Sequence, residues 1–495
     1  MIHYDAIVVG AGFSGLSAAT HLAQRGHSVA IVEKNLSAGG RARSFEASGF
    51  SFDMGPSWYW MPDIIESYFQ SVGTSVEEHL ELVRLNPSYR VWFEGGPIDV
   101  PAGQDRVGYL FESMEPGART RFHAFMGEAK TKYEIAVRNF ISVPGHSPFE
   151  LVKPQLIPQI LGLSIFGSLS DHVHSHFSDR RIRQILEFPV LFLGAKPDNT
   201  PALYSMMNYA DTALGTWYPM GGMKRLVEAM ESIARNAGIQ FYFDHAVTSI
   251  DYFEPQIVVE TSQERFGAYT VVASADYHHV EQSLLPPRWR RYDEDYWSER
   301  TLAPSSLIFF LGVNKRLRGL EHHNLFFDAD FNAHASTIYD QADWPKNPLF
   351  YVCAPSRTDS TVAPKDCENL FILIPLPPGL ADDRPKHEGL FQNVIDRMEG
   401  HLREDIKNHV VYRRDYAHSD FERDYNAYSG NAYGLANTLN QTAFLKPKMR
   451  SKLPGLFFAG QLTSPGPGVP PSLLSGQMAA KEANLWIQNI PSVKA

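Results

Sequence analysis

The chain has 495 residues, of which 44% are hydrophobic and 20% are charged, and its formal net charge is −10. This length exceeds the roughly 250–300 residues that one hydrophobic core serves, so we expect more than one domain, while the acidic balance argues against a nucleic-acid partner. The two cysteines, Cys353 and Cys367, exclude a disulfide framework and fit a reducing cytoplasm, and with no CxxC pair they predict no metal site.

The chain opens with a strand, a glycine-rich turn, a helix and a second strand. Asp5 to Val9 is a short apolar run, and Gly10 to Gly15 forms the turn. Leu16 to Arg25 has the spacing of small and apolar residues that is typical of a helix, and Ser28 to Val32 is a second buried strand. This order predicts a βαβ unit of about 30 residues and therefore a parallel sheet.

The rest of the chain mixes helical and strand patterns. The predicted helices are Arg119–Phe140, Leu226–Ala237 and Ser475–Ile487. The predicted strands are Ile239–Phe243, Val258–Thr261, Val271–Ala275, Leu307–Val313, Leu370–Ile374 and Leu456–Ala459.

One tract, Leu151 to Phe166, is strongly apolar but is interrupted by Lys153, glycines and prolines. It suits an amphipathic segment that contacts a membrane, and equally a buried helix pair that covers a substrate domain. No run reaches the roughly 18–20 apolar residues of a spanning helix, so we expect contact with a membrane surface rather than a crossing.

The first turn predicts a dinucleotide site. Gly10, Gly12 and Gly15 form the pattern GxGxxG, which permits a tight turn, close approach of a pyrophosphate and close packing of the helix on the strand. The helix N-terminus adds free amide groups for phosphate. Glu33 ends the second strand, where an acid accepts a hydrogen bond from a ribose hydroxyl. Shortly after it, Gly39-Gly40-Arg41 brings backbone and a guanidinium toward further phosphate oxygens.

Several blocks resemble the bacterial-type phytoene and carotenoid desaturases, within the superfamily of amine oxidase-like flavoproteins. The blocks are GAGFSGL, EK, AGGRARSF and GFSFDMGPSWYWMP near the N-terminus, YPMGGM from Tyr218, ASAD from Ala273, and the tail from Leu456 to Gly476. The resemblance implies an α/β fold with a Rossmann-like FAD-binding domain of the GR2 class, an interleaved mixed α+β substrate domain, and a helical segment that contacts a membrane.

On this basis we expect a discontinuous FAD-binding domain of residues 1–85, 215–280 and 431–495. The substrate-binding domain would comprise residues 86–140 and 281–430, and residues 141–214 would form the helical segment.

The resemblance also implies FAD contacts at matching positions. The expected pyrophosphate and ribose contacts are Gly10, Gly12, Gly15, Glu33, Gly40 and Arg41. Asp53, Gly55 and Pro56 are expected near the isoalloxazine, and Val247 is expected near the adenine. Gly460, Gln461 and Val469 are expected near the ribityl chain and the flavin ring. Gln461 departs from many flavoproteins of this fold, which have an acid there, although an amide can also bond a hydroxyl.

The implied activity is the introduction of C=C bonds into an acyclic carotenoid such as phytoene, by hydride transfer to the flavin, with oxygen or a quinone as electron acceptor. A polyene offers no charge, so its pocket should be long and apolar. The candidates for its lining are Trp58, Tyr59, Trp60 and Trp217, with core packing as the alternative. A lipophilic substrate implies a peripheral position on the cytoplasmic face of a membrane. No catalytic residue is identifiable from spacing.

Other interpretations stay open. The same fold could serve an amine oxidase-like flavin oxidase, a carotene cis–trans isomerase, or a protein that binds lipidated partners without flavin chemistry. His172, His174 and His176 alternate, so they could project together from a strand toward a metal, but surface or helix-turn histidines are the preferred interpretation. The pairs His278-His279 and His322-His323 are interpreted in the same way.

Overall fold

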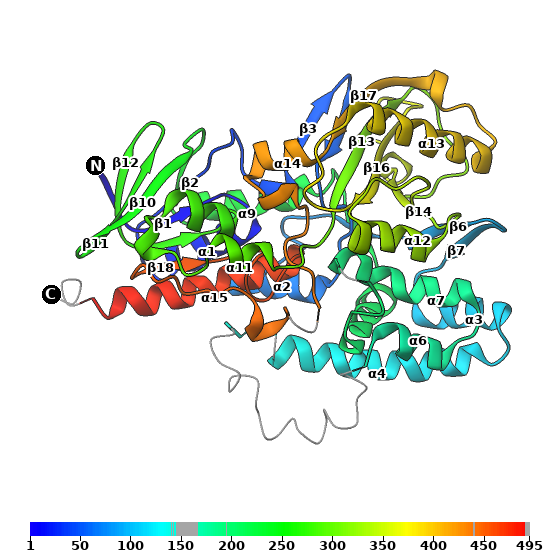
Figure 1. The fold of residues 1–495 in the computed structure, drawn as a ribbon, viewed down its shortest axis with the longest axis horizontal. Coiled ribbons are helices and arrows are strands. Elements are labelled where there is room, and N and C mark those ends of the chain that lie inside the picture. Colours follow the sequence, from blue (N-terminus) through cyan, green and yellow to red (C-terminus); the bar gives the residue numbers. More distant parts are fainter. Residues whose placement is uncertain (140, 142, 145–166, 195, 439–440, 491–495) are drawn as a thin grey trace.

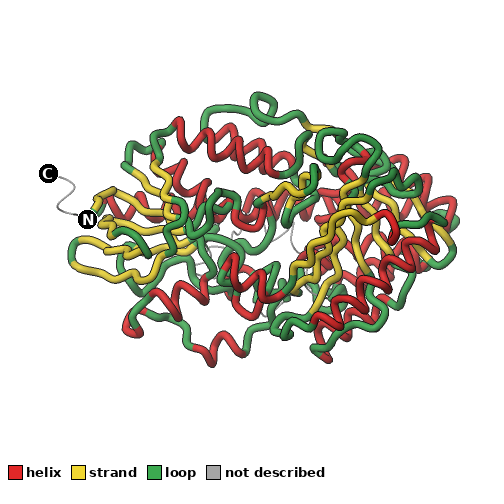
Figure 2. The backbone as a smooth tube through the Cα atoms, turned by 90° about the horizontal axis from the view of Figure 1, so that it is seen from above, coloured by secondary structure: helices red, strands yellow, loops and turns green. Residues whose placement is uncertain are grey.

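The computed structural model describes residues 1–139, 141, 143–144, 167–194, 196–438 and 441–490. Two seven-stranded sheets dominate this part of the chain. Figure 1 places the first sheet beside both termini and the second toward the opposite end of the long axis. Figure 2 shows helices and loops between the two sheets. The predicted α/β fold with a Rossmann-like unit is confirmed.

The first sheet has a parallel centre and an antiparallel edge. Its strands follow the order β10-β11-β12-β1-β2-β9, and β18 pairs with the far end of β12. Their bounds are β1 (Ile2–Val9), β2 (Val29–Val32), β9 (Gln240–Tyr242), β10 (Val247–Phe253), β11 (Gln256–Thr261), β12 (Arg265–Ala273) and β18 (Leu456–Phe458). The strand pairs β1–β2, β1–β12, β2–β9 and β12–β18 are parallel, so their carboxyl ends meet at one edge.

Four of the described helices pack with this sheet in one apolar core: α1 (Phe13–Ala23), α2 (Pro62–Ser71), α9 (Lys224–Asn236) and α15 (Val469–Gln488). Contact between α1 and α15 depends on Gly476, where a Cβ would lie 2.2 Å from the carbonyl oxygen of Ser14. Helix α15 begins at Val469 rather than at the predicted Ser475. Pro470 and Pro471, which indicated a loop, lie in its first turn, where a missing N–H costs no helical hydrogen bond.

The second sheet is almost entirely antiparallel. Its order is β17-β13-β16-β15-β14-β6-β7, and only β6 and β14 run parallel. The bounds are β6 (Tyr89–Phe93), β7 (Gly96–Val100), β13 (Ser305–Val313), β14 (His323–Phe326), β15 (Phe350–Cys353), β16 (Glu368–Leu376) and β17 (Val410–Tyr416). Every residue of β13 is buried, because alternate side chains enter two different cores. Leu307 and Phe309 pack against α13 (Arg384–Leu402), whereas Ile308 and Phe310 face the interior of the molecule.

Shorter elements connect these sheets. Two small pairings are the hairpin β3 (Ser44–Ala47) with β4 (Phe50–Asp53), and β5 (Leu82–Arg84) with β8 (Trp217–Pro219). The remaining α-helices are α3 (Gln104–Met114), α4 (Ala118–Asn139), α6 (Leu169–His176), α7 (Arg180–Glu187), α8 (Met206–Asn208), α10 (Tyr277–His279), α11 (Glu294–Ser298), α12 (Phe331–Ser336) and α14 (His418–Tyr425). The first sheet's strands fall within 1–85, 215–280 and 431–495, and the domain boundaries themselves stay a prediction.

The alternating histidines lie on a helix, α6, and not on a strand. His172 and His176 are one turn apart, with ring centroids 4.9 Å from each other, while His174 points elsewhere and pairs with Glu187 at 3.2 Å. The strand interpretation is therefore wrong. The apolar tract Leu151 to Phe166 lies outside the described residues. Among the residues that the structure does describe, no helix is long and apolar enough to cross a bilayer.

Candidate functional site

A cavity of about 570 Å³ extends between the two sheets. Its first half is lined by the turns that follow β1, β2, β12 and β18, which is where parallel sheets bind ligands. Its other half is lined by side chains of the second sheet, among them Ile308, Tyr351, Phe371 and Leu373. The cavity therefore joins a polar, glycine-rich end to an apolar one.

The glycines of the first turn form a backbone cradle at the polar end. Gly10 has a positive φ of +101°, and a Cβ on Gly15 would lie only 2.0 Å from the carbonyl oxygen of Gly10. Gly12 and Gly40 touch each other, since a Cβ on Gly40 would lie 3.2 Å from the Cα of Gly12. No side chain caps the N-terminus of α1, so its first amide groups stay available to an anion.

Glu33 lies in the cavity wall with one acceptor position to spare. Its Oε2 accepts from the backbone N–H of Ala11 at 2.8 Å. Its Oε1 accepts from the backbone and side-chain nitrogens of Asn35 at 2.8 and 2.7 Å. A carboxylate offers about four acceptor positions, so one on Oε2 remains for a hydroxyl in the cavity.

Arg41 lines the same end of the cavity and is poorly satisfied by the protein. Its Nη2 donates to the carbonyl of Asn431 at 3.4 Å, and the guanidinium lies 5.1 Å from the centre of the Tyr425 ring. Its buried Nε has no partner among the described residues. Burial lowers the pKa of Arg41, and the Asp276 carboxylate acts in the opposite direction. A buried cation with unused donors fits a phosphate group.

Of the three residues predicted near the isoalloxazine, two line the cavity and one has its side chain in the protein core. Gly55 and Pro56 line the cavity, and a Cβ on Gly55 would lie 2.3 Å from the carbonyl oxygen of Arg41. The Asp53 carboxylate instead accepts from the backbone nitrogens of Met223 and Lys224 at 2.7 and 3.1 Å and is not in the cavity wall. Burial raises the pKa of Asp53 to about 6. Its side chain caps α9, because β4 ends beside the start of that helix.

The adenine and ribityl candidates all lie in the wall of the cavity. Val247 is there as the first residue of β10. Gly460 has a φ of +115° and donates its N–H to Ser475 at 3.0 Å, and Gln461 donates to Asn431 at 3.1 Å. Val469 begins α15, whose N-terminus faces the cavity. The two following prolines have no N–H, which leaves Val469 as the amide donor of this turn.

The aromatic candidates alternate between the cavity and the core. Trp58 and Trp60 line the cavity, with ring centroids 5.0 Å apart. The Tyr59 side chain points into the apolar core beside the first sheet, and its backbone forms an isolated β-bridge with that of Trp217. Trp217 packs against the same core and donates to the carbonyl of Leu214 at 2.9 Å. The segment is extended, so successive side chains point to opposite sides, and Tyr59 and Trp217 do not line the cavity.

Sequence reasoning missed the polar groups behind these tryptophans. Trp60 donates to Thr216 at 2.7 Å, and Thr216 donates to the buried Asp211 at 3.0 Å. On the other side, Tyr351 bonds to Ser57 at 2.8 Å and to His323 at 2.7 Å. Apart from Thr216 and Asp211, which are five residues apart, these partners are distant along the chain, and no sequence motif marks them.

Comparisons with known proteins point to one family. A family described as flavin containing amine oxidoreductase matches residues 13–484. The chain is 39% identical over 481 residues to a protein named carotenoid 3,4-desaturase from Haloarcula japonica, covering 96% of this chain and 97% of that one. It is 29% identical over 490 residues to a zeta-carotene-forming phytoene desaturase from Myxococcus xanthus, covering 97% of this chain and 94% of that one.

Solved structures support the fold. An oxidoreductase from Methanosarcina mazei superposes with a TM-score of 0.62 at 17% identity, covering 96% of this chain and 99% of that one. A variant of putrescine oxidase superposes with a TM-score of 0.60 at 15% identity, covering 98% and 99% of the two chains. At such low identity these likenesses show a common architecture only.

Proposed function

The chain belongs to the family of flavin-containing amine oxidoreductases, and from this premise we propose that it is an FAD-dependent desaturase that introduces C=C bonds into an acyclic carotenoid. Its cofactor is FAD. The observation that carries the proposal is the single cavity with a glycine-rich, polar end and an aromatic, apolar end.

The polar end supplies the residues that would hold FAD. The touching Gly12 and Gly40, the uncapped start of α1 and the orphaned Nε of Arg41 suit a pyrophosphate. Glu33 would take a ribose hydroxyl on its open Oε2 position. FAD, when bound, supplies the acceptor for a hydride from the substrate.

The apolar end would position the polyene and exclude water. Trp58 and Trp60 form one wall, and Leu373 and Phe371 of β16 form another. A substrate without charges is oriented by shape alone, so the rigidity of these walls is the protein's main contribution to the chemistry. The second-sheet residues Ile308, Phe371 and Leu373 that line the cavity are apolar, which favours a hydrocarbon over an amine substrate.

The direct test uses the purified protein with FAD and phytoene in liposomes. We expect a flavin spectrum and the appearance of absorption from longer polyenes. Flavin without new polyene would favour an isomerase or an oxidase of another substrate, and absence of flavin after FAD is added would contradict the proposal. Within this test, Trp58→Ala should raise KM for the carotenoid while Tyr59→Phe, whose side chain faces the core, should not.

A second candidate substrate follows from the comparison with the Haloarcula japonica protein, because its identity to this chain exceeds that of the Myxococcus xanthus protein, 39% against 29%. Desaturation would then occur at a 3,4 bond of a carotenoid that is already unsaturated elsewhere. Supplying such a carotenoid and phytoene in parallel, and comparing kcat/KM, distinguishes the two.

We also propose a peripheral position on the cytoplasmic face of a membrane, with oxygen or a quinone as the electron acceptor. A lipophilic substrate and the apolar composition of residues 151–166 support this position. Replacing Ile160 and Leu161 with aspartate should weaken liposome binding and leave FAD binding unchanged. Unaltered liposome binding would refute the membrane role.

A further inference from the structure

Three buried side chains with metal-binding atoms gather behind Trp58. His322, His323 and Cys353 are 4%, 0% and 3% exposed, and one ligand atom from each lies within 4.8 Å of the others. His323 begins β14 and pairs across the ladder with Cys353, the last residue of β15. Directly opposite residues point to the same face of a sheet, so the strand register itself brings this imidazole and this thiol together.

Each imidazole is held by one ring nitrogen and leaves the other unused. The Nδ1 of His322 bonds to the hydroxyl of Thr358 at 2.8 Å, and the Nδ1 of His323 bonds to the hydroxyl of Tyr351 at 2.7 Å. Both Nε2 atoms are buried and have no hydrogen-bond partner in the described part of the chain. When Nδ1 carries the proton and donates it to the hydroxyl, Nε2 presents a lone pair.

The hydroxyls that bond to the two Nδ1 atoms correspond to the groups that orient histidine ligands in metal sites. Histidines that bind metals commonly donate the second ring N–H to an oxygen, which orients the ring. Burial lowers the pKa of both His322 and His323, which is the direction that a neutral metal ligand requires. The nearby Asp359 carboxylate acts on His322 and favours a positive charge there.

We propose that His322, His323 and Cys353 form a binding site for one zinc(II) ion, with both Nε2 atoms and the thiolate as ligands. Thiolate and imidazole ligands together suit this borderline-soft ion. Tetrahedral zinc with bonds of about 2.0–2.3 Å needs its ligand atoms about 3.3–3.6 Å apart. One ring nitrogen from each histidine and the Cys353 sulfur lie within 4.8 Å of one another, so the three residues would close by about an ångström around the ion.

Binding is a proton exchange without a redox step. The Cys353 thiol loses its proton to solvent as the sulfur–metal bond forms. Burial, with the Asp53 carboxylate acting in the same direction, raises the pKa of this thiol to about 12, so the proton leaves only when the ion binds.

The site would stiffen the wall of the substrate cavity. The His323 ring stacks on Trp58 with centroids 4.0 Å apart and planes 11° apart. An ion that fixes His323 thereby fixes the indole that faces the polyene. The inference does not depend on the identity of the substrate, and its failure leaves the desaturase proposal intact.

The test measures zinc in the FAD-loaded full-length protein. After incubation with zinc chloride and gel filtration, we expect about one equivalent per chain, with X-ray absorption at the zinc edge showing two nitrogen ligands and one sulfur ligand. Cys353→Ser and His323→Gln should lose the ion. Thr358→Val, which removes only the partner of His322, should weaken zinc binding by about 10–100-fold.

The matched control is Cys367→Ser, which removes the other cysteine of the chain and should keep the full equivalent of zinc. The flavin spectrum and circular dichroism verify the fold of each variant. Absence of zinc from the wild-type protein, equal zinc in Cys353→Ser and wild type, or an absorption spectrum without sulfur would overturn the proposal. The X-ray absorption spectrum of the wild-type protein tests the proposed ligands even where a variant does not fold.

Discussion

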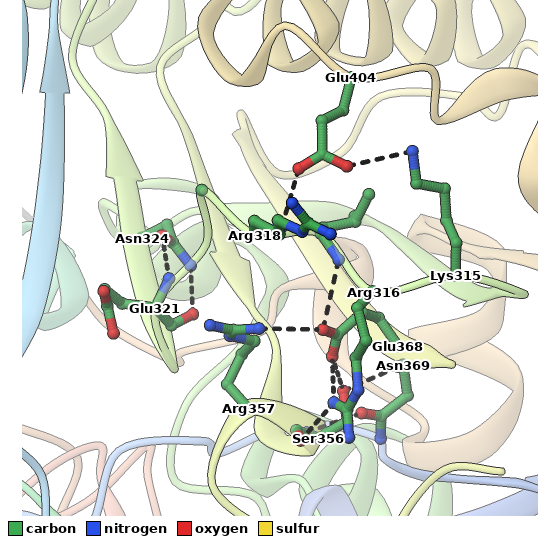
Figure 3. A network of polar contacts seen from close by, with 12 residues as sticks. Lys315, Arg316, Arg318, Glu321, Asn324, Ser356, Arg357, Glu368, Asn369 and Glu404 are labelled. Atoms are coloured by element: carbon green, nitrogen blue, oxygen red, sulfur yellow. Dashed lines mark hydrogen bonds and ion pairs between the residues drawn. The ribbon is translucent and has the colours of Figure 1, made fainter. Parts of the chain in front are cut away.

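Glu368 and Arg41 are both buried charged residues, but the protein satisfies them very differently. Glu368, the first residue of β16, is 0% exposed and lies in the network of Figure 3. Its carboxylate accepts from Arg316 at 3.1 Å, from Arg357 at 3.4 Å, from the backbone of Leu317 at 3.4 Å, and from the Ser356 hydroxyl. Its four acceptor positions are all filled.

Arg41 has five N–H donors and makes one hydrogen bond of 3.4 Å within the described residues. Its Nε is buried beside a cavity and unpaired there. Burying a charge without partners is costly, so a fold retains such a residue where a ligand completes it. Because all acceptor positions of Glu368 are hydrogen-bonded within the protein, we interpret Glu368 as a structural residue. Because Arg41 has unused donors beside the cavity, we interpret it as part of a binding site.

The largest expected effect concerns stability. Glu368→Ala removes the carboxylate that two arginines and a hydroxyl share, so the free energy of unfolding should fall by about 3–5 kcal/mol. The matched control is Glu404→Ala in the same network, where the partner Lys315 is partly exposed and the expected loss is about 1 kcal/mol or less. Urea denaturation measures both, and equal losses would contradict the distinction.

A second prediction concerns the Asp211 carboxylate, which accepts two hydrogen bonds from the described residues although it offers about four acceptor positions. Asp211 accepts from the hydroxyls of Thr216 and Tyr89 at 3.0 and 3.1 Å, and burial raises its pKa to about 7. Between pH 4 and 7 the unfolded chain loses this proton while the folded protein keeps it. Stability should therefore fall as pH rises through this range and level off above it, by up to about 4 kcal/mol from this group.

Asp211→Asn keeps the shape without the ionisation and should flatten that fall. The measurement is the free energy of unfolding of both proteins at several pH values. Asp53, with its pKa raised to about 6, contributes in the same direction, so the difference between wild type and variant isolates Asp211. Parallel curves would show that Asp211 is not the group responsible.

The first βαβ unit could be predicted from sequence because its determinants are local. Gly10, Gly12 and Gly15 act within one turn, and Glu33 follows one strand later. The order of the second sheet could not be predicted, since it pairs β6 with β14, more than 200 residues onward. The sequence predicts too late a start for α15, because Pro470 and Pro471 are as typical of a loop as of the first turn of a helix.

In the candidate site, too, local sequence predicts the position of some residues, while tertiary packing decides the position of others. Extended backbone predicts that Trp58 and Trp60 share a side, but only the packed structure decides that Tyr59 faces the core. Asp53 matched a motif, yet its side chain caps α9 across 170 positions of sequence. His322 and His323 had no local partner in the sequence, and Cys353 joins them only through the pairing of β14 with β15.

The smallest effect on stability is expected for a substitution of Arg41. This substitution also tests most directly the contrast between Arg41 and Glu368. Arg41→Met should weaken FAD binding by about 10- to 100-fold, the equivalent of charge-assisted hydrogen bonds worth about 1.5–3 kcal/mol, with little change in the stability of the FAD-free protein. Arg43→Met is the matched control, since Arg43 lies over the same Tyr425 ring and also has a buried Nε without a partner among the described residues, but its Nη2 is paired with Asp424 at 3.0 Å and it is absent from the cavity wall. Fluorescence titration with FAD separates the two. If Arg43→Met weakens FAD binding as much as Arg41→Met does, then an unpaired donor in the cavity wall is no guide to the cofactor site, because an arginine outside that wall would matter equally.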